Sequence, residues 1–343
     1  MFLGTNVMRL KNFQVGVLHL IAALILFTAA SLSAADRIRV AYVSPSVSQS
    51  LPWFAKELGI LSKYDLTAEV LLITGSPRLV QSLIAGDVDF VFAGVAALTR
   101  ARGRGAEVAI LGASANASSQ KLMISKTSKI RRIEDLKGAI IGVSQYGSEA
   151  DTFARLALAK AGLRPEKETT IIQLGGHPQV AASLAAGKLE VGVLGGLATL
   201  TAERAGARLL TSAQELKILS PSGTFATTRA YIQKNRSVVD RLMRSYVEAL
   251  HYIKTNRAGT ITLLQKYLGG LSAEESAYLY QDQVPILEAL PAPNEKAIQA
   301  VLDRENDPKI KSTPIADVID GSFFRDIEKS GLIEQLYKGK DKG

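Results

Sequence analysis

The chain has 343 residues, of which 47% are hydrophobic and 21% are charged, and its formal net charge is +9. This composition is typical of a folded protein with a sizeable core and excludes a disordered or fibrous chain. The length favours two α/β lobes of ordinary domain size. Lys and Arg are scattered along the sequence, which argues against a nucleic-acid-binding surface. Cysteine is absent, which excludes disulfides, thiolate metal sites and a nucleophilic thiol.

The first 35 residues have the pattern of a secretory signal peptide. Arg9 and Lys11 precede an apolar stretch at 15–32, and small residues follow from Ser33 to Ala35, as a signal peptidase requires. We predict cleavage after Ala35 and a periplasmic location for the mature chain, whose formal charge falls from +9 to +7 with the loss of two basic residues. The lack of cysteine excludes a lipid anchor at the cleavage point. An uncleaved membrane anchor is the alternative, because the apolar stretch is nearly long enough to span a bilayer.

After Ala35, short β-branched segments alternate with amphipathic helices. The first lobe is predicted to contain strands at 39–43, 69–73, 88–92 and 108–112, with helices at 53–59, 78–85 and 96–104. Such alternation favours a mostly parallel sheet covered on both faces. The pattern restarts at Gly138, and a second lobe of the same plan is predicted from strands at 139–143, 169–174, 190–194 and 208–211.

An internal repeat supports the two-lobe organisation. A shift of 101 positions aligns residues 75–97 with residues 176–198, and eight positions are identical, at Gly75, Pro77, Ser82, Leu83, Ala85, Gly86, Gly94 and Ala97. Glycine recurs at turns where the backbone needs a positive φ, so the match predicts one strand–turn–helix unit built twice. The loops of the two copies should face one cleft and bring Ser76 and His177 to the same place.

The last third of the chain is predicted to be helical. A turn-rich segment at 218–228 leads into helices at 237–254, 259–267, 273–283, 294–303 and 323–330. These helices have no sheet of their own, so we expect them to pack on the first lobe. The predicted organisation is therefore lobe 1 at 36–121 plus 226–343 and lobe 2 at 122–225, with hinge candidates at 121–126 and 220–228.

Motifs of common enzymes and metal sites are absent from the sequence. There is no G-x-S-x-G nucleophile elbow, no P-loop and no G-x-G-x-x-G. His177 and His251 are the only histidines after Ala35, and they lack the spacing of metal ligands. We therefore predict no catalytic residues, no metal and no cofactor.

Small polar residues follow the predicted strands at their carboxyl ends, where open α/β sheets bind ligands. Several of these residues open a helix, whose free N–H groups suit an anion, although Ser and Thr there also serve as helix caps. Tyr146 and Trp53 offer apolar faces. The predicted ligand-binding residues are Ser46, Gln49, Trp53, Gly75, Ser76, Gly94, Ser114, Tyr146, Gly147, Ser148, His177, Gly195 and Thr224.

Several segments resemble substrate-binding proteins of ABC transporters, of the nitrate, sulfonate and taurine type. They are residues 46–59, the run from Leu83 to Phe90, residues 133–138 with Ile141-Gly142-Val143, and the helix at 225–250. The resemblance covers nearly the whole chain after Ala35. It implies the α/β, two-lobed, type II periplasmic binding protein fold with a two-stranded hinge, in which the lobes close on a ligand.

The resemblance implies an exported, monomeric protein that delivers a small molecule to the permease of an ABC transporter. The positive charge and the Ser, Thr and Gly at helix starts favour a small organic anion, such as a sulfonate or carboxylate. A pyrimidine or thiamine-precursor heterocycle is the first alternative, and it would need an acidic partner. Glu149 and Asp151 are the nearby acids, and capping a helix is their simpler role.

Two further alternatives concern the class of protein. One is an enzyme of the same fold, and the other is a receptor that signals without feeding transport. The superfamily also includes proteins similar to thiamine-pyrimidine synthases, whose cysteine-rich loop has no counterpart in this sequence. That difference disfavours the enzyme.

Overall fold

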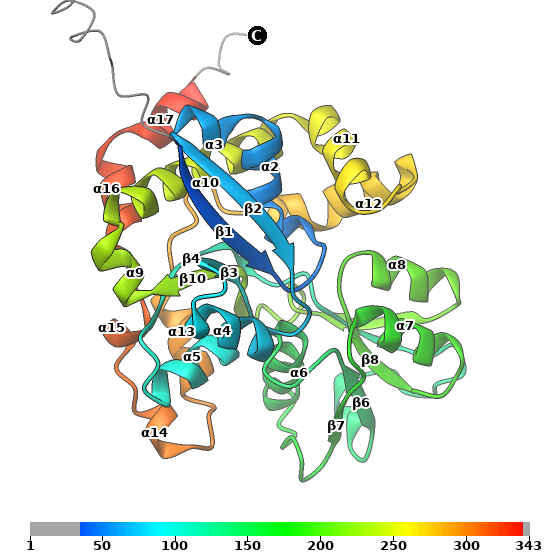
Figure 1. Ribbon diagram of the computed structural model, residues 1–343. Coiled ribbons are helices and arrows are strands. Elements are labelled where there is room, and N and C mark those ends of the chain that lie inside the picture. The colour runs from blue at the N-terminus through cyan, green and yellow to red at the C-terminus, as the bar shows by residue number, and fades with distance from the viewer. Residues whose placement is uncertain (1–34, 339–343) are drawn as a thin grey trace, which may run out of the picture. The chain divides into compact units, whose positions relative to one another are not determined.

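The computed structural model describes residues 35–338, which form two mixed five-stranded sheets flanked by helices (Figure 1). The first sheet has the order β2-β1-β3-β10-β4, with β1 Asp36–Tyr42, β2 Leu66–Leu72, β3 Phe90–Phe92, β4 Val108–Ala117 and β10 Leu219–Thr228. The second has the order β7-β6-β8-β5-β9, with β5 Lys121–Ile124, β6 Ile140–Val143, β7 Thr170–Gln173, β8 Val191–Leu194 and β9 Arg208–Ser212. Lobe 1 denotes the first sheet with its helices, and lobe 2 the second.

The two sheets share one strand order, which confirms the internal repeat. The parallel strands β2, β1 and β3 correspond to the parallel strands β7, β6 and β8. The helices between them correspond as well, since α4 Ser76–Ala85 and α5 Val95–Gly103 match α7 His177–Ala185 and α8 Leu197–Arg204. In each sheet an antiparallel strand takes the fourth position, β10 in lobe 1 and β5 in lobe 2.

The segment predicted to be turn-rich at 218–228 is instead the strand β10, so the prediction for this segment is wrong. β10 pairs with β3 and β4, so residues 219–225, which the sequence assigns to lobe 2, lie in the first sheet.

Both hinge candidates overlap the antiparallel strands β5 and β10. The chain passes between the sheets at 118–120 and at 213–218, and we propose these two crossings as the hinge.

Pro221 and Gly223 conceal β10 in the sequence. Pro221 lies where the register of β10 against β4 shifts, between Leu219 and Ser222, so its missing N–H interrupts no regular ladder. Gly223 has a φ of +60°, and a Cβ there would lie 2.0 Å from the Ser48 carbonyl oxygen. Glycine therefore allows β10 to approach the short 3-10 helix η1 Val47–Gln49 closely.

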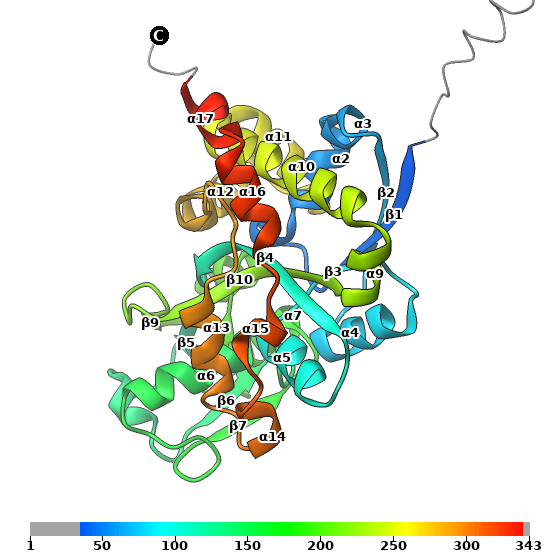
Figure 2. The ribbon, with the colours of Figure 1, turned by 90° about the vertical axis from the view of Figure 1, so that its left-hand side faces the viewer.

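Helices cover both faces of the first sheet, because successive strand residues point to opposite sides. Val40 faces one apolar cluster and Ala41 the other. The first face packs on α2 Leu51–Glu57, α3 Ile60–Lys63, α9 Arg229–Lys234, α10 Arg236–Thr255, α11 Arg257–Tyr267, α12 Ala273–Gln283, η3 Val284–Ile286, α16 Ser322–Lys329 and α17 Leu332–Tyr337. The second face packs on α4, α5, α13 Glu295–Leu302, α14 Pro308–Lys311 and α15 Ile315–Val318, and Figure 2 shows the last three running beside α5.

The C-terminal helices thus return to lobe 1, as expected. The second sheet is covered more simply, by α6 Glu149–Lys160 on one face and by α7 and α8 on the other, with η2 Ile133–Leu136 before β6. No helix within residues 35–338 is long and apolar enough to cross a membrane. The predicted signal peptide lies outside the described residues.

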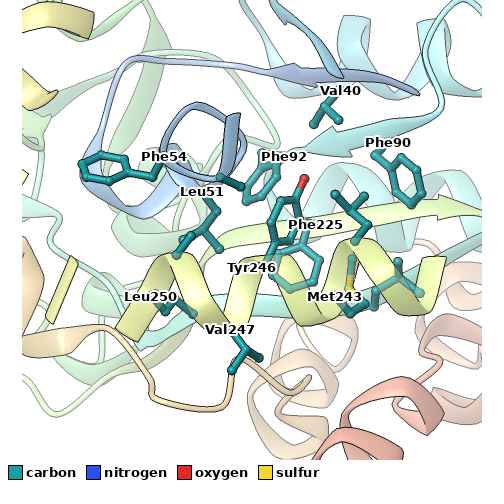
Figure 3. Packing of buried hydrophobic residues seen from close by; sticks show 14 of the residues in the cluster. Val40, Leu51, Phe54, Phe90, Phe92, Phe225, Met243, Tyr246, Val247 and Leu250 are labelled. Carbon is teal, nitrogen blue, oxygen red and sulfur yellow. The ribbon is translucent and has the colours of Figure 1, made fainter. Parts of the chain in front are cut away.

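Aromatic side chains form the centre of the lobe 1 core (Figure 3). Tyr246 of α10 is fully buried, and its ring centroid lies 5.7 Å from that of Phe92 and 5.6 Å from that of Phe225. Burial raises the pKa of the Tyr246 hydroxyl. Phe225 follows the glycine of β10 by two residues, so this core fixes the position of the β10 segment that faces the second sheet.

Candidate ligand-binding site

A cavity of about 440 Å³ lies where the loops of the two sheets meet. Its lining comes from the loops after β1, β2 and β3 in lobe 1 and from the loops after β6, β7 and β8 in lobe 2, which are the carboxyl ends of parallel strands. Ser76 and His177 both line it, which confirms the expectation from the repeat. Residues 119–120 of the first crossing, residues 221–223 of β10, Leu268 and Gln283 complete the lining.

Eight of the predicted ligand-binding residues line the cavity, namely Ser46, Gln49, Gly75, Ser76, Gly94, Ser148, His177 and Gly195. The other five lie elsewhere. Ser114 and Thr224 are buried next to Gly223, and Ser114 donates a hydrogen bond to the Gly223 carbonyl. Gly147 lies beside Arg100 of lobe 1.

The two aromatic residues among the predictions do not reach the cavity. Trp53 is 2% exposed and packs between Tyr42 and Tyr267 in lobe 1. Tyr146 is exposed, and its hydroxyl donates to the Ile171 carbonyl within lobe 2. The apolar part of the lining comes instead from aliphatic side chains and prolines, which include Val43, Pro45, Leu72, Pro178, Leu197, Pro221 and Leu268.

The hydroxyl groups at the helix starts are largely used within the protein. Ser76 Oγ accepts a hydrogen bond from the Gly94 N–H at 2.9 Å, which joins the loops after β2 and β3. Ser148 is the N-cap of α6, accepts from the Asp151 N–H and contacts Ser144 Oγ at 3.0 Å. Ser148 is therefore a helix cap, whereas Ser76 links two loops of lobe 1, and both bonds shape the loops that line the cavity.

Two glycines of lobe 1 let lobe 2 approach closely. A Cβ at Gly75 would lie 2.2 Å from Gln145 Oε1. A Cβ at Gly94 would lie 3.0 Å from the Gly147 carbonyl oxygen and 3.2 Å from the Glu149 nitrogen, which are backbone atoms and cannot swing aside. Small residues at Gly75 and Gly94 are thus required for the two lobes to come together around the cavity.

Glu149, the first residue of α6, places a carboxyl group at the cavity. Ser118 Oγ donates to its Oε1 at 2.7 Å, and the Ser222 hydroxyl also hydrogen-bonds the carboxyl group. Burial raises the pKa of Glu149 above its ordinary value, and the two hydroxyls only partly oppose this. No Lys or Arg lies in the lining formed by residues 35–338, so Glu149 has no cationic partner there.

Replacing Glu149 by Gln is expected to stabilise the fold at neutral pH. Because the pKa is raised in the folded state, stability falls as pH rises from the ordinary Glu value to the folded value, and the loss persists above it. We expect Glu149→Gln to raise the free energy of unfolding by about 1–2 kcal/mol at pH 7.5 and to have little effect at pH 4. Urea denaturation at both pH values measures this. Glu134→Gln, an exposed carboxyl of η2, is the control, and an equal gain at both pH values would contradict the burial argument.

His177 is a neutral group in the cavity wall. Burial lowers its pKa to about 4, although a hydrogen bond to the Val193 carbonyl opposes the shift. One ring nitrogen carries the N–H that donates to this carbonyl. The other nitrogen, Nδ1, is therefore an acceptor, and it is buried and has no partner within the described residues. At neutral pH, His177 therefore offers no positive charge to an anion.

Two glutamines in the lining have polar atoms without partners. Gln120 is 6% exposed, and its Oε1 accepts no hydrogen bond from residues 35–338. Gln283 is 1% exposed, and its Nε2 likewise has no partner in that part of the chain. Buried polar groups are normally hydrogen-bonded, so these atoms are suited to contact a bound molecule.

Comparison with known protein families shows to which family the chain belongs. Residues 33–267 match the model of the NMT1-like family. The chain belongs to this family. A relative from Brucella abortus, named "Putative binding protein BAB2_1146", is 36% identical to this NMT1-like protein over 139 residues. That alignment covers 39% of this chain and 41% of the relative, so the match spans about two fifths of the relative's length.

Solved structures show that this NMT1-like protein has the type II periplasmic binding protein fold. The periplasmic aliphatic sulphonate binding protein SsuA from Escherichia coli superposes with a TM-score of 0.68 at 20% identity, over 84% of this chain and 99% of SsuA. The periplasmic nitrate-binding protein NrtA from Synechocystis PCC 6803 gives 0.70 at 14% identity, over 86% and 89%. The enzyme DSZB gives 0.63 at 16% identity, over 86% and 99%, so the fold itself also supports catalysis. The resemblance predicted from sequence is confirmed for family and fold.

Proposed function

We propose that the protein is an exported, non-catalytic solute-binding protein that holds one small organic molecule between its lobes and presents it to the permease of an ABC importer. The cavity carries this proposal, because its lining comes from both lobes and includes buried polar atoms without partners. Its volume of about 440 Å³ lies within the range of small-molecule sites. Relatives of the same fold named for sulphonate or nitrate binding, and one solved with bound MOPS, support the assignment.

The lining favours a neutral or weakly basic solute over the organic anion expected from the sequence. Glu149 and His177 are the only ionisable side chains that the described residues place there, and burial keeps His177 neutral. An anion would gain backbone N–H groups at the starts of α4, α6 and α7 but no Lys or Arg. A solute that donates hydrogen bonds would satisfy Gln120 Oε1, His177 Nδ1 and the Glu149 carboxyl.

A calorimetric panel decides between the two solute classes. Taurine and benzoate represent the anions, and 4-aminopyrimidine represents an amino-substituted heterocycle. We expect 4-aminopyrimidine to bind more tightly than either anion, and Glu149→Gln to weaken it by about tenfold, since hydrogen bonds to charged groups contribute about 1.5–3 kcal/mol. Tight binding of taurine or benzoate with no binding of 4-aminopyrimidine would instead support the organic anion.

A further inference from the structure

Helix α12 of lobe 1 holds all the ion pairs that join the two lobes within residues 35–338. Arg204 of α8 contacts Glu275 at 2.9 Å and Glu274 at 3.3 Å. Lys121 of β5 lies 2.5 Å from Asp282. Every other ion pair in the described part of the chain joins residues of one lobe. In Figure 1, α12 lies directly above α8.

The Lys121–Asp282 pair is the more protected of the two contacts. Its side chains are 16% and 11% exposed, and Lys121 Nζ also donates to the Tyr278 hydroxyl of α12 at 3.2 Å. Burial lowers the pKa of Lys121, but Asp282 and Tyr278 outweigh it, so the net pKa is raised and the amine stays charged. A charged pair in this position is shielded from salt far better than an exposed pair.

The same helix ends in the cavity. Gln283 is its last residue, and the Gln283 Oε1 accepts a hydrogen bond from the Val47 N–H at 3.0 Å. That bond fixes the orientation of the amide group, because only the oxygen can accept. The Nε2 donor is therefore the free end, and it lies 3.2 Å from the point that a Cβ on Gly196 of lobe 2 would occupy.

Helix α12 packs into the core of lobe 1. Leu279 is 1% exposed and belongs to the lobe 1 core, and Ser276 is fully buried. The helix start is fixed by a capping box between Ser272 and Glu275. Its acidic residues thus project from a rigid support toward basic residues of the other lobe, and separating the lobes separates these charges.

We infer that α12 is a clasp that couples solute recognition to lobe closure, with Gln283 as a specificity-determining residue that donates its free Nε2 hydrogen to the solute. This inference rests on the proposed function and extends it. The solute must then carry a hydrogen-bond acceptor opposite Gln283, in addition to donors facing Glu149 and Gln120. The ion pairs of Arg204 and Lys121 favour the closed arrangement in which Gln283 meets the solute.

The clasp is testable without any solute, because the chain has no cysteine and two introduced cysteines can be labelled uniquely. Asp87→Cys and Lys188→Cys place one exposed label on each lobe, at equivalent positions of the repeat. We expect Arg204→Gln combined with Asp282→Asn to lengthen the distance between spin labels or to broaden its distribution. Arg132→Gln, whose partner Glu134 lies in the same lobe, is the control and should change nothing. Unchanged distances in the double variant would overturn the clasp.

Gln283 is tested by binding of the three panel compounds. Gln283→Glu keeps an acceptor for the Val47 N–H and removes the donor, so we expect at least a tenfold loss of affinity for the compound that binds the wild type. The change in label distance caused by the Arg204→Gln, Asp282→Asn double variant should be the same in this background. Gln335→Glu, an exposed residue of α17 outside the cavity lining, is the matched control and should bind like the wild type. Equal affinities of wild type and Gln283→Glu would overturn the role of Gln283. Failure of every compound to bind the wild type counts against the proposed solute class, while the label distances still decide the clasp.

Discussion

Gly94→Val is expected to lower the affinity of the cavity for its solute by about tenfold to a hundredfold while leaving the fold intact. Gly94 has an ordinary backbone conformation, with φ −66° and ψ 137°, so a larger residue causes no local strain. Its side chain would instead meet the backbone of Gly147 and Glu149 in lobe 2. Overpacking of this kind costs about 1–3 kcal/mol. Two of the three contacts belong to the closed arrangement, and the third is the Ser76 side chain of lobe 1, 3.2 Å from the added Cβ.

Calorimetry with the panel compound that binds the wild type measures the effect, and urea denaturation checks the fold. Gly176→Val is the matched control, because Gly176 also lines the cavity but a Cβ there would meet only its own lobe, the flexible Gln179 side chain most closely and Pro178 at an ordinary contact distance. Equal losses of affinity in both variants would show that the cavity is sensitive to volume and not to contact between the lobes.

Phe225→Ala is expected to destabilise the protein by about 3–5 kcal/mol. Phe225 is 1% exposed, and its ring lies against those of Phe92, Tyr246 and Phe324. The substitution leaves a void in the centre of lobe 1, next to the β10 segment that lines the cavity. Urea denaturation monitored by circular dichroism measures the loss.

Leu219→Ala on the same strand provides the control, because Leu219 is 53% exposed and its truncation should cost less than about 0.5 kcal/mol. Similar destabilisation by the two variants would contradict the placement of β10 inside the first sheet, with Phe225 facing the core.

The repeat and the parallel strands could be predicted from the sequence because they depend on local patterns. The alternation of strands and helices, and the glycines that recur 101 residues apart, follow from turn geometry and from the burial of both sheet faces. The eight predicted residues that line the cavity follow from one rule, since parallel strands bring their carboxyl ends to one edge. Helix α12 was also predicted with the bounds it has in the structure.

The remaining features depend on contacts between distant segments. β10 was hidden because its Pro221 and Gly223 are typical of turns, and only pairing with β3 and β4 reveals a strand. Gln283 lies 236 residues from its partner Val47, so no local pattern places it in the cavity. Gln120 lies in the crossing between sheets, and Glu149 resembles an ordinary helix-start acid. The carboxyl ends of strands were the only sequence signal for the site, and Gln283, Gln120 and Glu149 do not directly follow a predicted strand.

Native mass spectrometry of the protein purified from its native host tests the central claim most directly. We expect one small molecule bound per chain, released unchanged on denaturation, and lost from the Gly94→Val variant but retained by Gly176→Val. If the wild type carries no bound molecule and also binds none of the panel compounds, a solute-binding function is contradicted. Conversion of an added panel compound into a chemically different molecule would show an enzyme instead.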